Sequence, residues 1–209
     1  PVLLSVAAGA SAADKAVKMP YVYTNWRHFT VEDGLPNDLI FAVKADGPKV
    51  WVGTDNGGLN HWEAATGRWK AYRHDPRNAG SVGGNSVLAV LRDRRGDLWA
   101  GAWNGGLSRF EPDTGIFKTY PTTLPVTSLA RRASGGWIAI AQNGLYGWEP
   151  KTNEYKLVHG PSQPARSEII YNDAAVDQQG RLLVGTVNMN DPFLPEGLLC
   201  RLDPDGSFH

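Results

Sequence analysis

The chain has 209 residues, which is enough for one sizeable domain. Its 21 Lys and Arg residues balance 21 Asp and Glu residues, so charge gives no reason to expect nucleic acid as a partner. The single cysteine, Cys200, excludes an intramolecular disulfide and a thiolate metal cluster, and its apolar surroundings predict a small buried residue. Abundant Gly, Pro and Trp, with no sustained helical period, favour an all-β fold.

Residues 1–13 read "PVLLSVAAGASAA", an apolar stretch that ends in a small-x-small sequence. This is typical of the end of a truncated secretory signal peptide, and the stretch is too short to span a bilayer. We therefore expect an exported protein, periplasmic or extracellular, with residues 14–25 as a linker. The alternative is an Ala-rich tail without a targeting role.

Four copies of one repeat fill most of the remaining sequence. Residues 50–72 and 98–120 match at an offset of 48, a third copy spans 136–158, and a fourth spans 180–208 with an insertion. In each copy, turns rich in Gly and Asp separate four short runs with the alternation of strands, which is the pattern of one propeller blade. The sequence predicts a β-propeller domain over residues 26–209, with antiparallel four-stranded blades at about 34–75, 83–121, 125–159 and 168–209.

The repeat also explains its most regular residues. The aromatic residues at one repeated position are predicted to lie in the core between blades: Trp62, Phe110 and Trp148. Glycines in the second strands are predicted to allow close approach of backbones or a bulge: Gly53, Gly101 and Gly185. Phe208 corresponds to an outer-strand aromatic, and only His209 follows it. We therefore expect a fragment of a larger, six- or seven-bladed propeller.

Residues 26–121 resemble the two-component regulator propeller family. The resemblance rests on "WRHFTVEDGLPNDLIFAV", "VWVGTDNGGLNHW" and "NGGLSRFEPDTGIFKTY". Membership would imply the extracytoplasmic ligand-binding part of a signalling protein, with output domains that this sequence does not contain.

Residues 125–208 resemble a second propeller family, the senescence-marker-protein/gluconolactonase/luciferin-regenerating group. The matching stretches are "PVTSLARRASGGWIAIAQNGLYGWEPKTNEYKLV", "YNDAAVDQQGRLLVGTVN" and "PEGLLCRLDPDGSF". This resemblance implies a lactonase with one divalent cation, such as calcium, on the propeller axis. Asn172 falls on one of that family's metal ligands, and Asp173 becomes a candidate substrate contact. The family's Glu ligand falls on Leu88 when it is counted five residues back from Asp93, and leucine cannot bind calcium.

Two interpretations of Asn172 and Asp173 therefore remain. They are ligands for a metal or substrate, or they are strand-entry residues that hydrogen-bond to local backbone, as Asn37 and Asp38 would. The insertion "NMNDPFLPEG" (188–197) adds Asp191 and Glu196 as candidate substrate contacts, against the alternative of a solvated loop. None of the five histidines has metal-ligand spacing, and all are expected at the surface or at strand ends.

Two functions are compatible with these patterns. The first is a sensing module that binds a small molecule or saccharide on its central face. The alternative is a metal-dependent lactonase, in which no catalytic residue can be assigned. Because the expected Glu is missing, the sequence favours binding; a scaffold for protein partners is a third reading.

Overall fold

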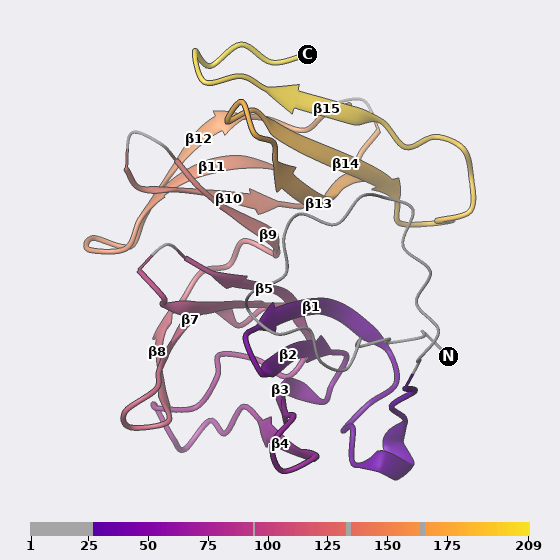
Figure 1. Ribbon diagram of the computed structural model, residues 1–209. Helices are drawn as coiled ribbons and strands as arrows, with labels where there is room; N and C mark the ends of the chain where they lie inside the picture. Colours follow the sequence, from indigo (N-terminus) through magenta and orange to yellow (C-terminus); the bar gives the residue numbers. More distant parts are fainter. Residues whose placement is uncertain (1–26, 94, 133–134, 164–165) are drawn as a thin grey trace.

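The computed structural model describes residues 27–93, 95–132, 135–163 and 166–209. The predicted signal segment 1–13 and linker 14–25 lie outside this part. Four antiparallel sheets follow one another along the chain as blades (Figure 1), which confirms the predicted all-β propeller architecture. Blade 1 contains β1 (Ile40–Asp46), β2 (Lys49–Thr54), β3 (Gly58–Glu63) and β4 (Arg68–Tyr72). Blade 2 contains β5 (Val87–Arg92), β6 (Leu98–Ala102), β7 (Gly106–Glu111) and β8 (Ile116–Tyr120).

Blade 3 contains β9 (Val126–Arg131), β10 (Trp137–Ala141), β11 (Gly144–Glu149) and β12 (Glu154–His159). Blade 4 contains β13 (Ile169–Val176), β14 (Leu182–Asn188) and β15 (Leu199–Leu202). Phe208 bridges Leu202, and the backbones of Arg201 and His209 exchange two hydrogen bonds of 2.9 Å. Phe208 therefore occupies the outer-strand position that the repeat predicted.

The hydrophobic core is divided into clusters between successive blades. Leu59 of blade 1 packs with Val87 and Phe110 of blade 2, and Trp99 of blade 2 packs with Trp148 of blade 3. Phe110 and Trp148 thus lie between blades, as predicted. A third cluster joins blades 3 and 4 and contains Cys200, which is buried as expected.

Blade 1 has no preceding blade in this part of the chain, and the N-terminal segment 27–35 covers its free face. Phe29 makes edge-to-face contacts with Trp62 and Trp69 at 5.0 Å and 5.6 Å between ring centroids. Leu35 is buried in the same cluster, just after the 3-10 turn η1 (Val31–Asp33). A capping box fixes this turn, because Thr30 and Asp33 bond reciprocally to each other's backbone or side chain. Trp62 therefore packs against this segment instead of another blade.

The prediction that all histidines lie at the surface or at strand ends is wrong for His61. His61 is in the middle of β3 and only 8% exposed. Its ring stacks on Trp51 of the neighbouring strand, with ring centroids 4.6 Å apart. This contact removes the imidazole from solvent, and a repeat-based alignment alone does not reveal it.

Candidate functional site

The innermost strand of every blade carries a β-bulge at the same place. In blade 1, Ile40 pairs with Thr54 but Ala42 pairs with Gly53, which leaves Phe41 as the extra residue. The same shift leaves Leu88 extra in β5 and Thr127 extra in β9. In β13, Asn172 and Asp173 together face only Gly185. A bulge re-aims side chains away from the regular alternation of a strand.

These bulges surround one central pocket of about 710 Å³, lined by the innermost strands of all four blades. Each of these strands contacts the next in sequence around the axis. Each bulge contributes to the lining: Phe41, Leu88, Thr127, Asn172 and Asp173. All four bulge positions lie five residues before the turn that ends the strand, at Asp46, Asp93, Arg132 and Asp177.

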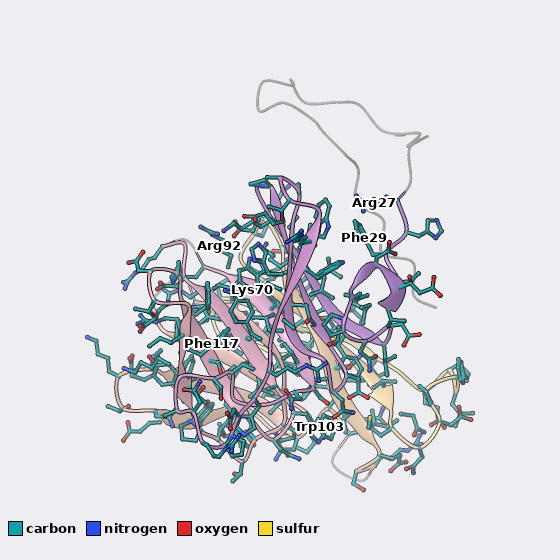
Figure 2. All side chains as sticks on the ribbon, turned by 90° about the horizontal axis from the view of Figure 1, so that it is seen from below. Arg27, Phe29, Lys70, Arg92, Trp103 and Phe117 are labelled. Carbon is teal, nitrogen blue, oxygen red and sulfur yellow. The ribbon has the colours of Figure 1, made fainter. Side chains whose placement is uncertain are left out.

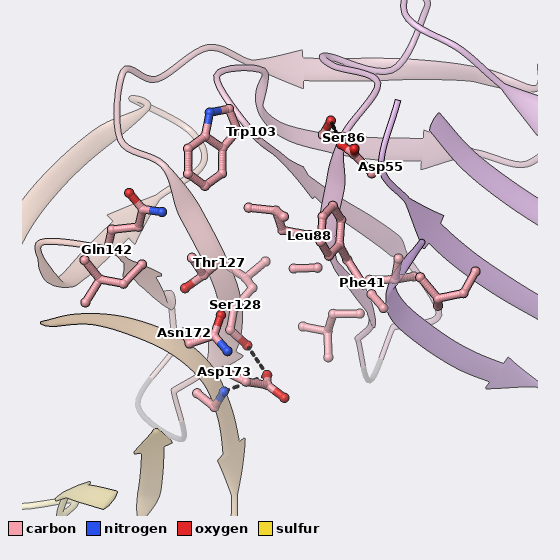
Figure 3. Close-up of a pocket in the computed structure, with 18 of the residues that line it drawn as sticks. Phe41, Asp55, Ser86, Leu88, Trp103, Thr127, Ser128, Gln142, Asn172 and Asp173 are labelled. Carbon is pink, nitrogen blue, oxygen red and sulfur yellow. Dashed lines mark hydrogen bonds between the residues drawn. The ribbon is translucent and has the colours of Figure 1, made fainter. Parts of the chain in front are cut away.

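The pocket has one apolar wall and one polar wall (Figure 3). Phe41 and Leu88 from blades 1 and 2 form the apolar wall. Thr127 and Ser128 from blade 3, with Asn172 from blade 4, form the polar wall. Pockets of this kind use apolar surface for affinity and a few polar groups for orientation.

A second ring of lining residues follows the second strand of three blades. Asp55, Trp103 and Gln142 occupy equivalent positions there, directly after β2, β6 and β10. The Asp55 carboxylate accepts a hydrogen bond from Ser86 at 2.6 Å. Sequence reasoning missed these three residues. The sequence signal that could have revealed them is the repeat, because its offset of 48 relates Asp55 to Trp103.

Asn172 and Asp173 lie together in this pocket but differ in their contacts. Oδ1 of Asp173 accepts a hydrogen bond from its neighbour's backbone, Ala174 N, at 2.7 Å, and a longer one from Ser128 at 3.5 Å. The Asn172 carboxamide is exposed and has no hydrogen-bond partner among the described residues. Asp173 therefore acts partly as a local backbone acceptor, whereas Asn172 is available to a ligand.

The comparison with Asn37 and Asp38 does not hold in the structure. Asn37 precedes β1 and accepts a hydrogen bond from Leu39 N at 2.7 Å. The blade 1 residue that corresponds to Asn172 is Phe41. Strand entry is thus a separate position from the bulge.

Asp191 and Glu196 do not line the central pocket in the described structure; both stabilise the loop between β14 and β15. Asp191 Oδ1 accepts a hydrogen bond from Phe193 N at 3.0 Å. Glu196 accepts one from Arg166 at 2.8 Å and one from Asn188 at 2.7 Å. These two hydrogen bonds, from Arg166 and then Asn188, hold the pKa of Glu196 below its ordinary value.

The residues in the central pocket do not fit a bound divalent cation. A calcium ion requires six to eight oxygen ligands, with carboxylates among them. At the four bulges, Phe41 and Leu88 offer no oxygen, and the Thr127 hydroxyl already donates to backbone carbonyls of Ile140 and Tyr171. No group of three His, Cys, Asp or Glu side chains suited to a metal occurs in the part of the chain that the structure describes.

Comparison with known families agrees with the second resemblance. The family described as "SMP-30/Gluconolactonase/LRE-like region" matches residues 89–209, more than half of the chain. The chain belongs to this family. No curated protein matches the sequence. The family match begins at Ala89, within β5, and runs through blades 3 and 4. It thus includes the bulge residues Thr127, Asn172 and Asp173 but not Phe41 or Leu88.

Solved structures show that this SMP-30/gluconolactonase-like chain shares its fold with parts of other bacterial proteins. The extracellular domain of BT4673 from B. thetaiotaomicron, described both as a one-component and as a hybrid two-component system, matches with TM-scores of 0.62 and 0.60. The two matches have 19% and 18% identity, cover 91% and 88% of this chain, and cover 23% and 22% of the BT4673 chains. PorZ from Porphyromonas gingivalis, a surface component of the type-IX secretion system, matches with a TM-score of 0.56 and 12% identity, over 88% of this chain and 28% of its own.

The chain therefore spans about a quarter of the length of these structures. At such low identity the similarity establishes the propeller fold and nothing finer. Within the described residues, no helix has the length and apolar character needed to cross a membrane.

Proposed function

We propose that this chain is an extracytoplasmic sensing module whose central pocket binds a neutral small molecule of the saccharide class. The observation that carries the proposal is the two-walled pocket. Phe41 and Leu88 offer apolar surface, and across from them Asn172 offers a carboxamide without a hydrogen-bond partner among the described residues. Trp103, in the second ring of lining residues, adds an aromatic ring. Sugars present an apolar C–H face and hydroxyl edges, which suits such a pair of walls.

The charge of the pocket narrows the ligand class. Among the described residues that line it, Asp55 and Asp173 are the only ionisable ones, and none carries a basic side chain. Acidic ligands would be repelled by these carboxylates, while neutral hydroxyls can donate to them. An exported location is supported by the signal-like sequence of residues 1–13 and by the extracellular domains that share the fold. Any signalling output would belong to segments other than this one.

Calorimetric titration with neutral oligosaccharides and with uronic-acid oligosaccharides tests this proposal. We expect binding of a neutral sugar, weakened about tenfold by Asn172→Ala because one hydrogen bond is lost. Asn190→Ala is the matched control, since Asn190 lies in the β14–β15 loop outside the pocket lining. No binding by any neutral sugar, or equal affinity in Asn172→Ala, would overturn the proposal.

The alternative is the metal-dependent lactonase that the family membership suggests. One observation favours the lactonase: Asn172 lies at the axis, where the resemblance places a metal ligand. Calcium titration separates the two functions. The lactonase would be favoured by a heat of calcium binding that disappears in Asn172→Ala, together with calcium-dependent lactone hydrolysis. We expect to observe neither, because Phe41 and Leu88 supply no oxygen ligands.

A further inference from the structure

A second cavity, of about 770 Å³, lies between blades 1 and 2. Strands β2, β3 and β4 supply one wall, and Phe110, Pro112 and Gly115 of blade 2 supply the other. None of its lining residues belongs to the central pocket. In Figure 2, Lys70 of this cleft and Trp103 of the central pocket are drawn well apart.

The blade 1 wall carries two rows of side chains across its strands. Lys49 pairs with Glu63, which pairs with Arg68; Trp51 pairs with His61, which pairs with Lys70. Three cations thus face one carboxylate. In the described part of the chain, none of the three cations forms an ion pair with the protein.

The same positions in blade 2 are balanced. The offset of 48 places five residues there: Asp97, Arg109, Glu111, Ile116 and Lys118. Arg109 bonds to Glu111 at 3.3 Å and lies 3.9 Å from Asp97, so its charge is neutralised internally. Blade 1 has His61 in place of Arg109, Lys49 in place of Asp97, and Arg68 in place of Ile116. Because the fold tolerates the balanced set in blade 2, the excess positive charge of blade 1 is not a requirement of the blade.

His61 adds an independent observation. It is more than nine-tenths buried, it lines the cleft, and its Nε2 atom has no hydrogen-bond partner among the described residues. The indole nitrogen of Trp51, on which His61 stacks, also lacks a partner there. Burial, followed by the nearby Lys49, lowers the pKa of His61, which favours the neutral imidazole with one ring nitrogen as a donor.

We propose that the cleft between blades 1 and 2 binds a small multivalent anion of the carboxylate or phosphate class. Lys49, Arg68 and Lys70 would neutralise its charge, and the imidazole of His61 would provide a buried donor beside them. An apolar part of the ligand could pack against Phe110 and Pro112. This site is separate from the central pocket in both position and charge.

Titration with citrate and with inorganic phosphate tests the proposal, with the indole N–H of Trp51 and the imidazole of His61 followed by NMR. We expect saturable shifts of both resonances that weaken as salt is raised. The arm that saturates at lower concentration identifies carboxylate or phosphate as the better ligand. Lys49→Asp combined with Arg68→Ile installs the blade 2 residues and is expected to weaken binding at least about tenfold.

The control is Lys118→Gln, which removes the blade 2 counterpart of Lys70 and should change affinity less than about twofold. Lys70→Gln provides a milder variant should the double substitution fail to fold. Shifts that never saturate with either anion, or binding that the Lys49/Arg68 variant and Lys70→Gln both retain, would overturn the proposal. Neutral-sugar binding to the central pocket should be the same in all these variants.

Discussion

At the scale of single residues, one bulge position per blade decides the chemistry of the axis. The backbone repeats the same irregularity four times, so the side chain at that position is free to vary without changing the blade. Phe41 and Leu88 make half of the pocket apolar, while Thr127 and Asn172 make the other half polar. The same four positions exclude a set of oxygen ligands, because two of them carry hydrocarbon side chains.

The glycine position of the second strand gives a prediction at this scale. A Cβ atom on Gly53 would lie 2.4 Å from the backbone oxygen of Val87 in blade 2, whereas one on Gly101 would have 3.4 Å to Ala89. We expect Gly53→Ala to reduce the free energy of unfolding by about 2–3 kcal/mol, because two blades must move apart. Gly101→Ala should change it by less than about 1 kcal/mol. Urea denaturation of both variants measures this difference, and equal effects would contradict it.

At the scale of elements, the long β14–β15 loop is held in place by polar contacts. Glu196 joins it to Arg166, which also bonds to Glu168 at 2.8 Å, and to Asn188 at the end of β14. This clamp accounts for Glu196 without a ligand. It also leaves Phe193 at the tip almost fully exposed, at 94%. The loop is therefore ordered at its base by charge-assisted hydrogen bonds instead of by hydrophobic contacts.

Glu196→Gln should release this clamp. We expect faster hydrogen exchange of the loop amides between 189 and 198, by about twofold to tenfold at pH 7, because a charged acceptor is replaced by a neutral one. Glu154→Gln, on the exposed edge strand β12, is the control. A loop whose exchange is unchanged in Glu196→Gln would show that the clamp has no role.

The lowered pKa of Glu196 fixes the direction of the pH effect on the same loop. A carboxylic acid whose pKa is lowered in the folded state stabilises that state at pH values above its ordinary pKa of 4.5. This contribution to stability is lost as the pH falls through the lowered pKa. Cleavage of the wild-type loop by pepsin should therefore increase as the pH is lowered below 4.5. In Glu196→Gln the cleavage rate, corrected for enzyme activity, should lack this step.

At the scale of the whole molecule, the repeat made the fold predictable, and departures from the repeat made the sites hard to predict. Alternation, Gly-rich turns and repeated aromatics indicated the four blades, and Phe208 was assigned to an outer strand from alignment alone. The burial of His61 and the contacts of Glu196 depend on which side chains meet across strands or loops. Asn172 could be predicted as a candidate site residue because the repeat does not require an asparagine there. Trp103 could not, because a tryptophan is also an expected core residue of an aromatic-rich blade.

The N-terminal segment allows a test of how the blades support one another. Each cluster of the core is shared between neighbours, and the segment 27–35 plays the neighbour's role for blade 1 through Phe29, which is 6% exposed. We expect Phe29→Ala to reduce the free energy of unfolding by about 3–5 kcal/mol, as is usual for a buried aromatic. Phe41→Ala, which truncates a 43% exposed ring in the central pocket, should cost about 1 kcal/mol or less.

Hydrogen exchange should show where the damage from Phe29→Ala occurs. In an array of repeats each unit is stabilised mainly by its nearest neighbours, so the amides of β2 and β3 should lose protection before those of β10 and β11. Uniform loss across all four blades would instead indicate that the propeller unfolds as one cooperative unit and that segment 27–35 supports the whole structure. Exchange measured in mildly destabilising urea distinguishes these outcomes, because a local opening of blade 1 leaves the Trp99–Trp148 contact between blades 2 and 3 intact.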